Sequence, residues 1–253
     1  MQRLRVRYTK LGRVRFLSAR DLTSVWERSL RRAQLPIAYS EGFTPHAKVS
    51  FPDALPVGYA STGEYAELTF ATDIEPSSGL ARLSTAMPTG MDILTYVTVA
   101  EGARRLSGHL RATLWEVAWP GMPAEQCSDF LIDLSDRADA LVASESVEVV
   151  RHRPKGDRIL DVRPPLVSHA TFAGADGDMT APILRVVLRN DGPTIRPTDL
   201  KSALDDLSAS SQPLPQPRLY SRLAQGLVHE DGITEALSQQ VNQLHPDRHA
   251  EAA

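Results

Sequence analysis

Alternating apolar and charged residues at the start of the chain predict two half-buried β-strands. Leu4, Val6 and Tyr8 alternate with arginines, and the segment from 13 to 16 repeats this pattern after a turn at Leu11-Gly12. Successive side chains of a strand point to opposite faces, so one face of each segment is expected to be buried.

A helical period begins at Asp21. Apolar residues from Leu22 to Ala33 recur three and four positions apart, and Pro36 marks the end of the predicted helix. The next predicted elements are a strand at 65–72, a helix at 76–87 and a strand at 91–99. Together they form a predicted N-terminal unit with a basic surface, residues 1–104.

A second cycle of elements predicts another unit at 109–230. Its expected elements are a strand at 114–119, a helix at 123–134, a hairpin at 147–152 and 159–162, a strand at 182–189, a helix from 198 to 207 and a strand at 217–223. Both cycles follow the order strand, helix, strand, strand, helix, strand. The sequence therefore predicts an α+β fold of two tandem ferredoxin-like (βαββαβ) units with antiparallel sheets. Residues 231–253 are expected to be a polar tail, frayed or helical.

Composition indicates an ordinary globular protein. The chain has 253 residues, of which 42% are apolar and 23% charged. We expect a cytoplasmic location and no membrane contact, because no apolar run approaches the roughly 20 residues of a membrane helix and the first residues lack a signal peptide. A single cysteine, Cys127, forms no intramolecular disulfide and no metal cluster by itself. No metal and no cofactor are expected.

Charge is distributed unevenly along the chain. Residues 1–50 carry eleven lysines and arginines against three acidic residues, a net charge of +8, so the remainder carries −11 of the total of −3. Such a division can create a positive surface that attracts phosphate groups. The alternative interpretation is that these charges are the solvated edges of a strand and a helix.

The segment from Tyr39 to Ser61 combines glycine, proline, histidine, lysine and phenylalanine. If residues 48–51 are extended, then His46, Lys48 and Ser50 project from one face. This arrangement would direct an imidazole, an ammonium and a hydroxyl at one solvent-facing site. The alternative is a long connection in which His46 is hydrogen-bonded to the backbone.

The run from Arg5 to Leu68 resembles the start of a radical-SAM-associated family of uncharacterised function. The positions that carry the resemblance are Arg15, Phe16, Ser18, Asp21, Glu27, Arg28, Arg31, Arg32, Tyr39, Ser40, Gly42, Phe43, Pro45, His46, Lys48, Ser50, Phe51, Leu55, Pro56, Gly58 and Glu64. The resemblance implies a radical S-adenosylmethionine (SAM) enzyme as a partner or relative, since members occur as separate proteins or as the C-terminal part of such enzymes. One departure is Ala19, which replaces the histidine of the family signature.

Two functional classes follow from these features, and binding is favoured over catalysis. In the first, the chain is an RNA-binding or adaptor protein for structured or ribosomal RNA. In the second, it is a metal-independent ribonuclease or a subunit of an RNA-modification enzyme in which His46 is the candidate catalytic residue. A protein-interaction scaffold is a third alternative. The predicted RNA- or phosphate-binding residues are Arg13, Arg15, Arg20, Arg28, Arg31, Arg32, Tyr39, Phe43, His46, Lys48 and Ser50. For Ser18 and Asp21, directly before a helix, capping is the favoured role.

Overall fold

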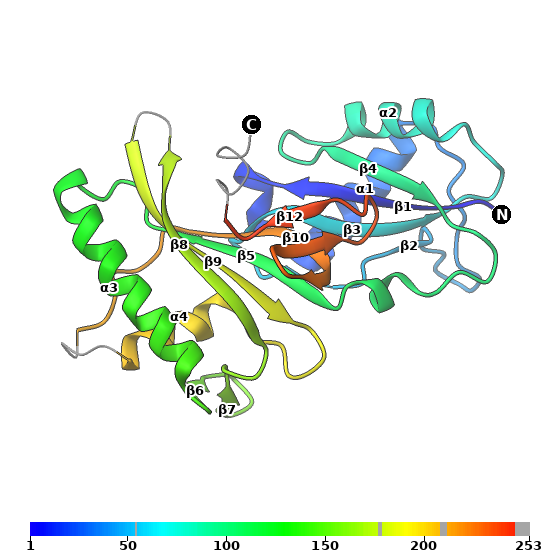
Figure 1. Ribbon diagram of the computed structural model, residues 1–253. Coiled ribbons are helices and arrows are strands. Elements are labelled where there is room, and N and C mark those ends of the chain that lie inside the picture. Colours follow the sequence, from blue (N-terminus) through cyan, green and yellow to red (C-terminus); the bar gives the residue numbers. More distant parts are fainter. Residues whose placement is uncertain (54, 177–178, 208–211, 246–253) are drawn as a thin grey trace. The chain divides into compact units, whose positions relative to one another are not determined.

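The computed structural model describes residues 1–53, 55–176, 179–207 and 212–245. This described chain is a mixed α+β protein with four α-helices and mostly antiparallel strands (Figure 1). It divides into two compact units. The first comprises Met1–Leu110 with Glu235–Gln240, and the second is the rest of the described chain from Arg111 on. Among the described helices, none combines the length and apolar character needed to cross a bilayer.

Strand β1 (Arg3–Lys10) is the central strand of the first unit. It pairs antiparallel with β3 (Ala60–Thr69) on one side and with β4 (Ile93–Thr98) on the other. The short strand β2 (Val49–Ser50) pairs antiparallel with β3. Because β1 has a neighbour on both sides, its main-chain groups are used within the sheet.

The segment from 13 to 16 is a 3-10 helix, η1 (Gly12–Phe16), and the prediction of a strand there is wrong. The chain turns at Gly12, whose φ of +56° suits glycine. After the turn, the N–H of Leu17 donates to the carbonyl of Val14. Both sides of β1 are already paired with β3 and β4, so a second N-terminal strand would have no place beside it.

Two helices complete the core of the first unit. Helix α1 (Ala19–Arg32) contacts α2 (Pro76–Ala86), and both helices lie in segments that the sequence predicted to be helical. Trp26 of α1 is fully buried and meets Tyr8 of β1 edge-on, with ring centroids 5.1 Å apart. The buried face of α1 is therefore the apolar stripe predicted from the sequence.

The second unit repeats the arrangement of a central strand with antiparallel neighbours. Strand β5 (Ala112–Ala118) lies between β9 (Met179–Arg189) and β10 (Leu219–His229), and β8 (Leu166–Asp176) pairs with β9. Its helices are α3 (Ala124–Ala143) and α4 (Pro197–Asp206), which contact each other. Cys127 is buried on α3, consistent with a packing role.

The predicted hairpin of the second unit exists but is not part of the main sheet. Strands β6 (Glu148–Arg151) and β7 (Arg158–Asp161) form a separate two-stranded sheet. The strand beside β9 is instead β8, which the sequence pattern did not predict. Gly174 and several small residues weaken the period-two pattern of β8, and this explains the omission.

The segment predicted as a polar tail contributes two strands, β11 (Gly232–Glu235) and β12 (Val241–Gln243). Ile233 is fully buried and Leu244 is 5% exposed in the same apolar cluster of the second unit. The prediction of a frayed or helical segment is therefore wrong for 232–243, because a hairpin buries its few apolar residues. Residues 246–253 of the predicted tail lie outside the described chain.

Candidate functional site

The start of α1 is fixed by a reciprocal cap. The Asp21 N–H donates to the Ser18 hydroxyl (3.2 Å), and the Asp21 carboxylate accepts hydrogen bonds from the hydroxyl (2.6 Å) and N–H (3.3 Å) of Ser18. These hydrogen bonds, from the side chain and then the backbone of Ser18, lower the pKa of Asp21, and the charges of Arg20 and Arg28 add to the effect. Ser18 and Asp21 thus have the capping role, and they set where the helix arginines begin.

Helix α1 distributes the predicted arginines over two flanks of its exposed side. Arg28 and Arg32 are one turn apart and lie on the flank next to α2. At about 100° per residue, Arg20 and Arg31 fall instead on the flank of Glu27. All four arginines are exposed. The sequence predicted one basic surface, and the structure places these arginines on two flanks of the exposed side of α1.

Between α1 and the end of α2 lies a groove of about 380 Å³. It is lined by Val25, Arg28, Ser29, Arg32, Ala86, Met87 and Pro88. The hydroxyl of Ser29 is anchored to the carbonyl of Ala86 (3.3 Å), which ties the two helices together beneath the groove. The groove thus combines two guanidinium groups with apolar walls.

The basic residues of β1 are largely used inside the first unit. Arg5 is 6% exposed, and its Nε lies 2.8 Å from the Glu67 carboxylate, which also contacts Arg3. Lys10 is 2% exposed and donates to the carbonyl of Leu17 (3.0 Å). Because β1 is central in its sheet, part of the N-terminal positive charge is neutralised internally and is not on the surface.

The two predicted arginines of η1 have different environments. Arg13 is exposed, whereas Arg15 is half-buried with its guanidinium carbon 4.8 Å from the centroid of the Phe16 ring. Such stacking holds a cation in place without a carboxylate. Arg13 is therefore the more accessible of the two.

The connection from α1 to β2 presents alternate side chains to solvent. His46, Lys48 and Ser50 are exposed, while the intervening Ala47 and Val49 pack against the core. This is the alternation expected of an extended segment.

A tight loop precedes that extended segment. The Ser40 N–H donates to the His46 carbonyl (2.8 Å), and the His46 N–H donates to the Ser40 hydroxyl (3.0 Å). Gly42 has a φ of +122° within the loop. Next to it Phe43 is fully exposed, and Tyr39 is 49% exposed. The loop thus exposes two aromatic rings to solvent.

The structure pairs His46 with Glu27, a residue that was not among the predicted site residues. The Nδ1 atom of His46 lies 3.9 Å from Oε1 of Glu27, and the His46 side chain is 71% exposed. Phe51 also meets Trp26 of α1, with ring centroids 5.9 Å apart. Packing of the segment from His46 to Phe51 against α1 brings His46 and Glu27 together. No local sequence pattern predicts this contact.

These features define a mixed α+β protein in which the exposed side of α1 is rich in arginine and the loop that follows α1 exposes two aromatic rings. The chain belongs to a bacterial family described as "Uncharacterized protein conserved in bacteria (DUF2344)", whose model matches residues 3–197. No curated protein sequence matches the chain. The family description assigns no activity and no partner, so the predicted association with a radical SAM enzyme stays a prediction.

Proposed function

We propose that the protein is an RNA-binding module that holds a single-stranded segment of RNA on its first unit. The observation that carries this proposal is the groove in which Arg28 and Arg32 stand beside the apolar side chains of Val25 and Met87. Guanidinium groups bind phosphate oxygens through paired N–H donors, and unstacked bases bind apolar or aromatic surfaces. A nucleotide offers both parts at once.

The loop before β2 supplies a second surface of the kind that binds single-stranded RNA. Phe43 and Tyr39 are exposed rings, and Lys48 is an exposed cation in the extended segment that follows. Stacking of a base on an aromatic ring contributes about 1–3 kcal/mol without demanding a particular sequence. The proposed ligand is therefore an RNA loop or single strand rather than a double helix.

The proposal includes the ferredoxin-like character of both units, which the strand pairings support. In the first unit β1 lies between β3 and β4, with β2 on the outer side of β3. In the second, β5 lies between β9 and β10, with β8 on the outer side of β9. This is the order that a βαββαβ unit produces if the β6–β7 hairpin is an insertion.

The test is binding of a fluorescent single-stranded RNA, measured by anisotropy at 50 and 200 mM salt. Each phosphate contact contributes a slope of roughly 0.7 in log affinity against log salt, so four contacts weaken binding about fifty-fold over this range. Replacing Arg28, Arg31 and Arg32 together by Glu is expected to abolish binding at the higher salt.

The second unit offers a matched control for the same change of charge. Arg153, Lys155 and Arg158 are all exposed near the β6–β7 turn, and their triple replacement by Glu should leave most of the affinity intact. Equal losses of RNA affinity in the two triple variants would show that binding responds only to the net charge of the protein. Failure of the folded wild-type protein to bind RNA at 50 mM salt would refute the proposal.

A second candidate function, RNA cleavage, is favoured by the pair of His46 and Glu27. General acid–base cleavage needs two proton-transfer groups, and the structure provides a carboxylate 3.9 Å from the imidazole. Denaturing gels of the binding reactions check this candidate. Cleavage that disappears in His46→Ala while binding persists would support catalysis, and intact RNA throughout would leave a binding module.

We further propose that the module acts with a radical SAM enzyme, as the resemblance of residues 5–68 implies. The described chain itself holds one cysteine, whereas the iron–sulfur cluster of such an enzyme requires several thiolates. Purification of the chain from its native cells should recover an iron–sulfur enzyme of this class together with RNA. Recovery of RNA without such an enzyme would contradict the partnership and leave the binding proposal standing.

A further inference from the structure

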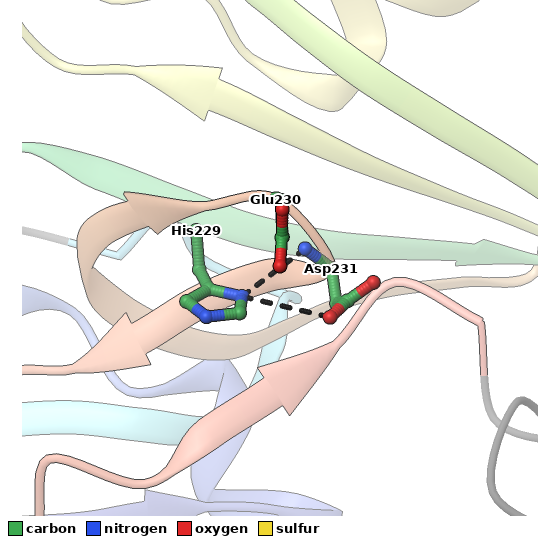
Figure 2. Close-up of side chains that lie close together, drawn as sticks. All are labelled: His229, Glu230 and Asp231. Atoms are coloured by element: carbon green, nitrogen blue, oxygen red, sulfur yellow. Dashed lines mark hydrogen bonds and ion pairs between the residues drawn. The ribbon is translucent and has the colours of Figure 1, made fainter.

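The turn between β10 and β11 gathers three metal-ligating side chains in the second unit. His229, Glu230 and Asp231 are consecutive, and one ligand atom from each lies within 4.8 Å of the others. In Figure 2 the two dashed lines join Nδ1 of His229 to the backbone nitrogen and to a carboxylate oxygen of Asp231. The fully buried Ile233 anchors the strand that follows, so the turn that carries these side chains is held against the core.

Contacts within this turn hold the ring of His229 close to Asp231. The N–H of Asp231 donates to Nδ1 of His229 (3.1 Å), and the same nitrogen lies 3.9 Å from Oδ2 of Asp231. An imidazole nitrogen has one lone pair in the plane of the ring, so a metal ion at Nδ1 would replace the hydrogen bond from Asp231, whereas an ion at Nε2 would leave it intact.

A cavity of about 350 Å³ adjoins the turn and contains further donors. Glu230 and Asp231 line it together with His169 and His245. The Nε2 atom of His169 lies 3.2 Å from Asp139, while its buried Nδ1 has no hydrogen-bond partner within the described part of the chain. An imidazole nitrogen buried in this way costs free energy unless a ligand or water satisfies it.

We propose that His229, Glu230 and Asp231 bind a divalent first-row transition-metal ion of the zinc class. One imidazole and two carboxylates form a mixed nitrogen and oxygen set that such ions accept, and three protein ligands leave a coordination position for water or a small ligand. That position would face the cavity lined by His169 and His245. The site belongs to the second unit and does not rest on the proposed RNA surface.

The test uses the full chain without a polyhistidine tag, stripped of metal by dialysis. Titration with Zn²⁺ by calorimetry, and with Co²⁺ by visible absorption, should show one ion per chain with a dissociation constant in the micromolar range or below. A His229→Asn, Asp231→Asn double variant should bind at least tenfold more weakly. Zn²⁺ should raise the thermal midpoint of the wild type but not that of the variant, which also checks that the variant folds.

The β6–β7 turn provides a matched control, since His152 and Asp157 form another exposed pair with Nδ1 and Oδ1 2.9 Å apart. A His152→Asn, Asp157→Asn double variant should bind Zn²⁺ as the wild type does. X-ray absorption should show only nitrogen and oxygen around the ion, because sulfur would identify Cys127 instead. Absence of binding at 1 mM Zn²⁺, a sulfur ligand, or equal losses in the two double variants would overturn the proposal.

Discussion

Glu235 illustrates how a charged residue can be buried in this protein. It is 0% exposed, and its carboxylate accepts hydrogen bonds from the Tyr65 hydroxyl, the Leu237 N–H, and both the N–H and the hydroxyl of Ser238. Burial raises the pKa of Glu235, but the hydrogen bonds from Ser238, Tyr65 and Leu237 outweigh it and leave the pKa below its ordinary value. The charged form is therefore part of the folded state.

The stability of the protein should depend on this carboxylate in acid. A pKa that is lower in the folded chain than in the unfolded one contributes stability that is complete above the ordinary value of 4.5 and is lost as the pH falls below it. Glu235→Gln should lower the free energy of unfolding at pH 7 by about 1–3 kcal/mol and flatten its decline below pH 4.5. Urea unfolding across a pH series measures both effects.

Glu41→Gln is the control for this measurement, because Glu41 is exposed in the same unit. It should reproduce the wild-type profile. Parallel pH profiles for the Glu235 variant and the wild type would show that the hydrogen bonds to the carboxylate do not contribute as inferred.

At the scale of the element, α1 shows how a short signal positions a surface. The cap formed by Ser18 and Asp21 sets the first turn, and the apolar stripe then fixes which side of the helix faces the core. Both features are local, so they follow from spacing along the chain. The two flanks that carry Arg28 and Arg31 are consequences of the same geometry.

Removal of the cap should destabilise α1 measurably. Ser18→Ala is expected to lower the free energy of unfolding by about 1 kcal/mol, because it leaves the N–H of Asp21 without its side-chain acceptor. Ser24→Ala is the matched control: Ser24 is exposed on the same helix, and its hydroxyl donates to the carbonyl of Arg20 (3.2 Å). Ser24→Ala should leave the free energy of unfolding nearly unchanged in the same urea titration. A neutral Ser18→Ala variant would contradict the capping role.

At the scale of the whole molecule, the C-terminal segment is a structural part of both units. Ile233 and Leu244 belong to an apolar cluster of the second unit, while Leu237 belongs to a cluster of the first that includes Tyr65 and Leu106. Residues far from the N-terminus therefore complete cores that are otherwise built from much earlier residues. The units are compact in space but are not continuous in sequence.

Because Ile233 is buried in the core of the second unit, its replacement should destabilise the protein strongly, although the sequence placed this residue in a polar tail. Ile233→Ala should lower the free energy of unfolding by about 2–5 kcal/mol, since it leaves a cavity in a packed cluster. Val241→Ala, in the partner strand and 41% exposed, should cost much less. Unfolding followed by tryptophan fluorescence, to which Trp115 of the second unit contributes, compares the two. Equal small effects would mean that this hairpin is not part of the core.

The sequence by itself determined the mixed α+β class, the buried face of β1, the stripe of α1 and its cap. Each of these depends on interactions within a few residues, so the pattern of apolar and polar positions carries the information. The exposed alternation of His46, Lys48 and Ser50 is of the same kind. Segments with a weak local pattern, such as β8 with its glycine and small residues, could not be read in this way.

Only the tertiary structure decided which charges are on the surface and which residues meet. Arg5 and Lys10 look like solvent-facing residues in an alternating strand, yet they are buried because β1 is the central strand and finds partners at Glu67 and Leu17. Likewise Glu27 meets His46, and Glu235 meets Tyr65, across long separations in sequence. Such pairs depend on how strands and helices pack, and packing is a property of the folded chain that no local spacing encodes.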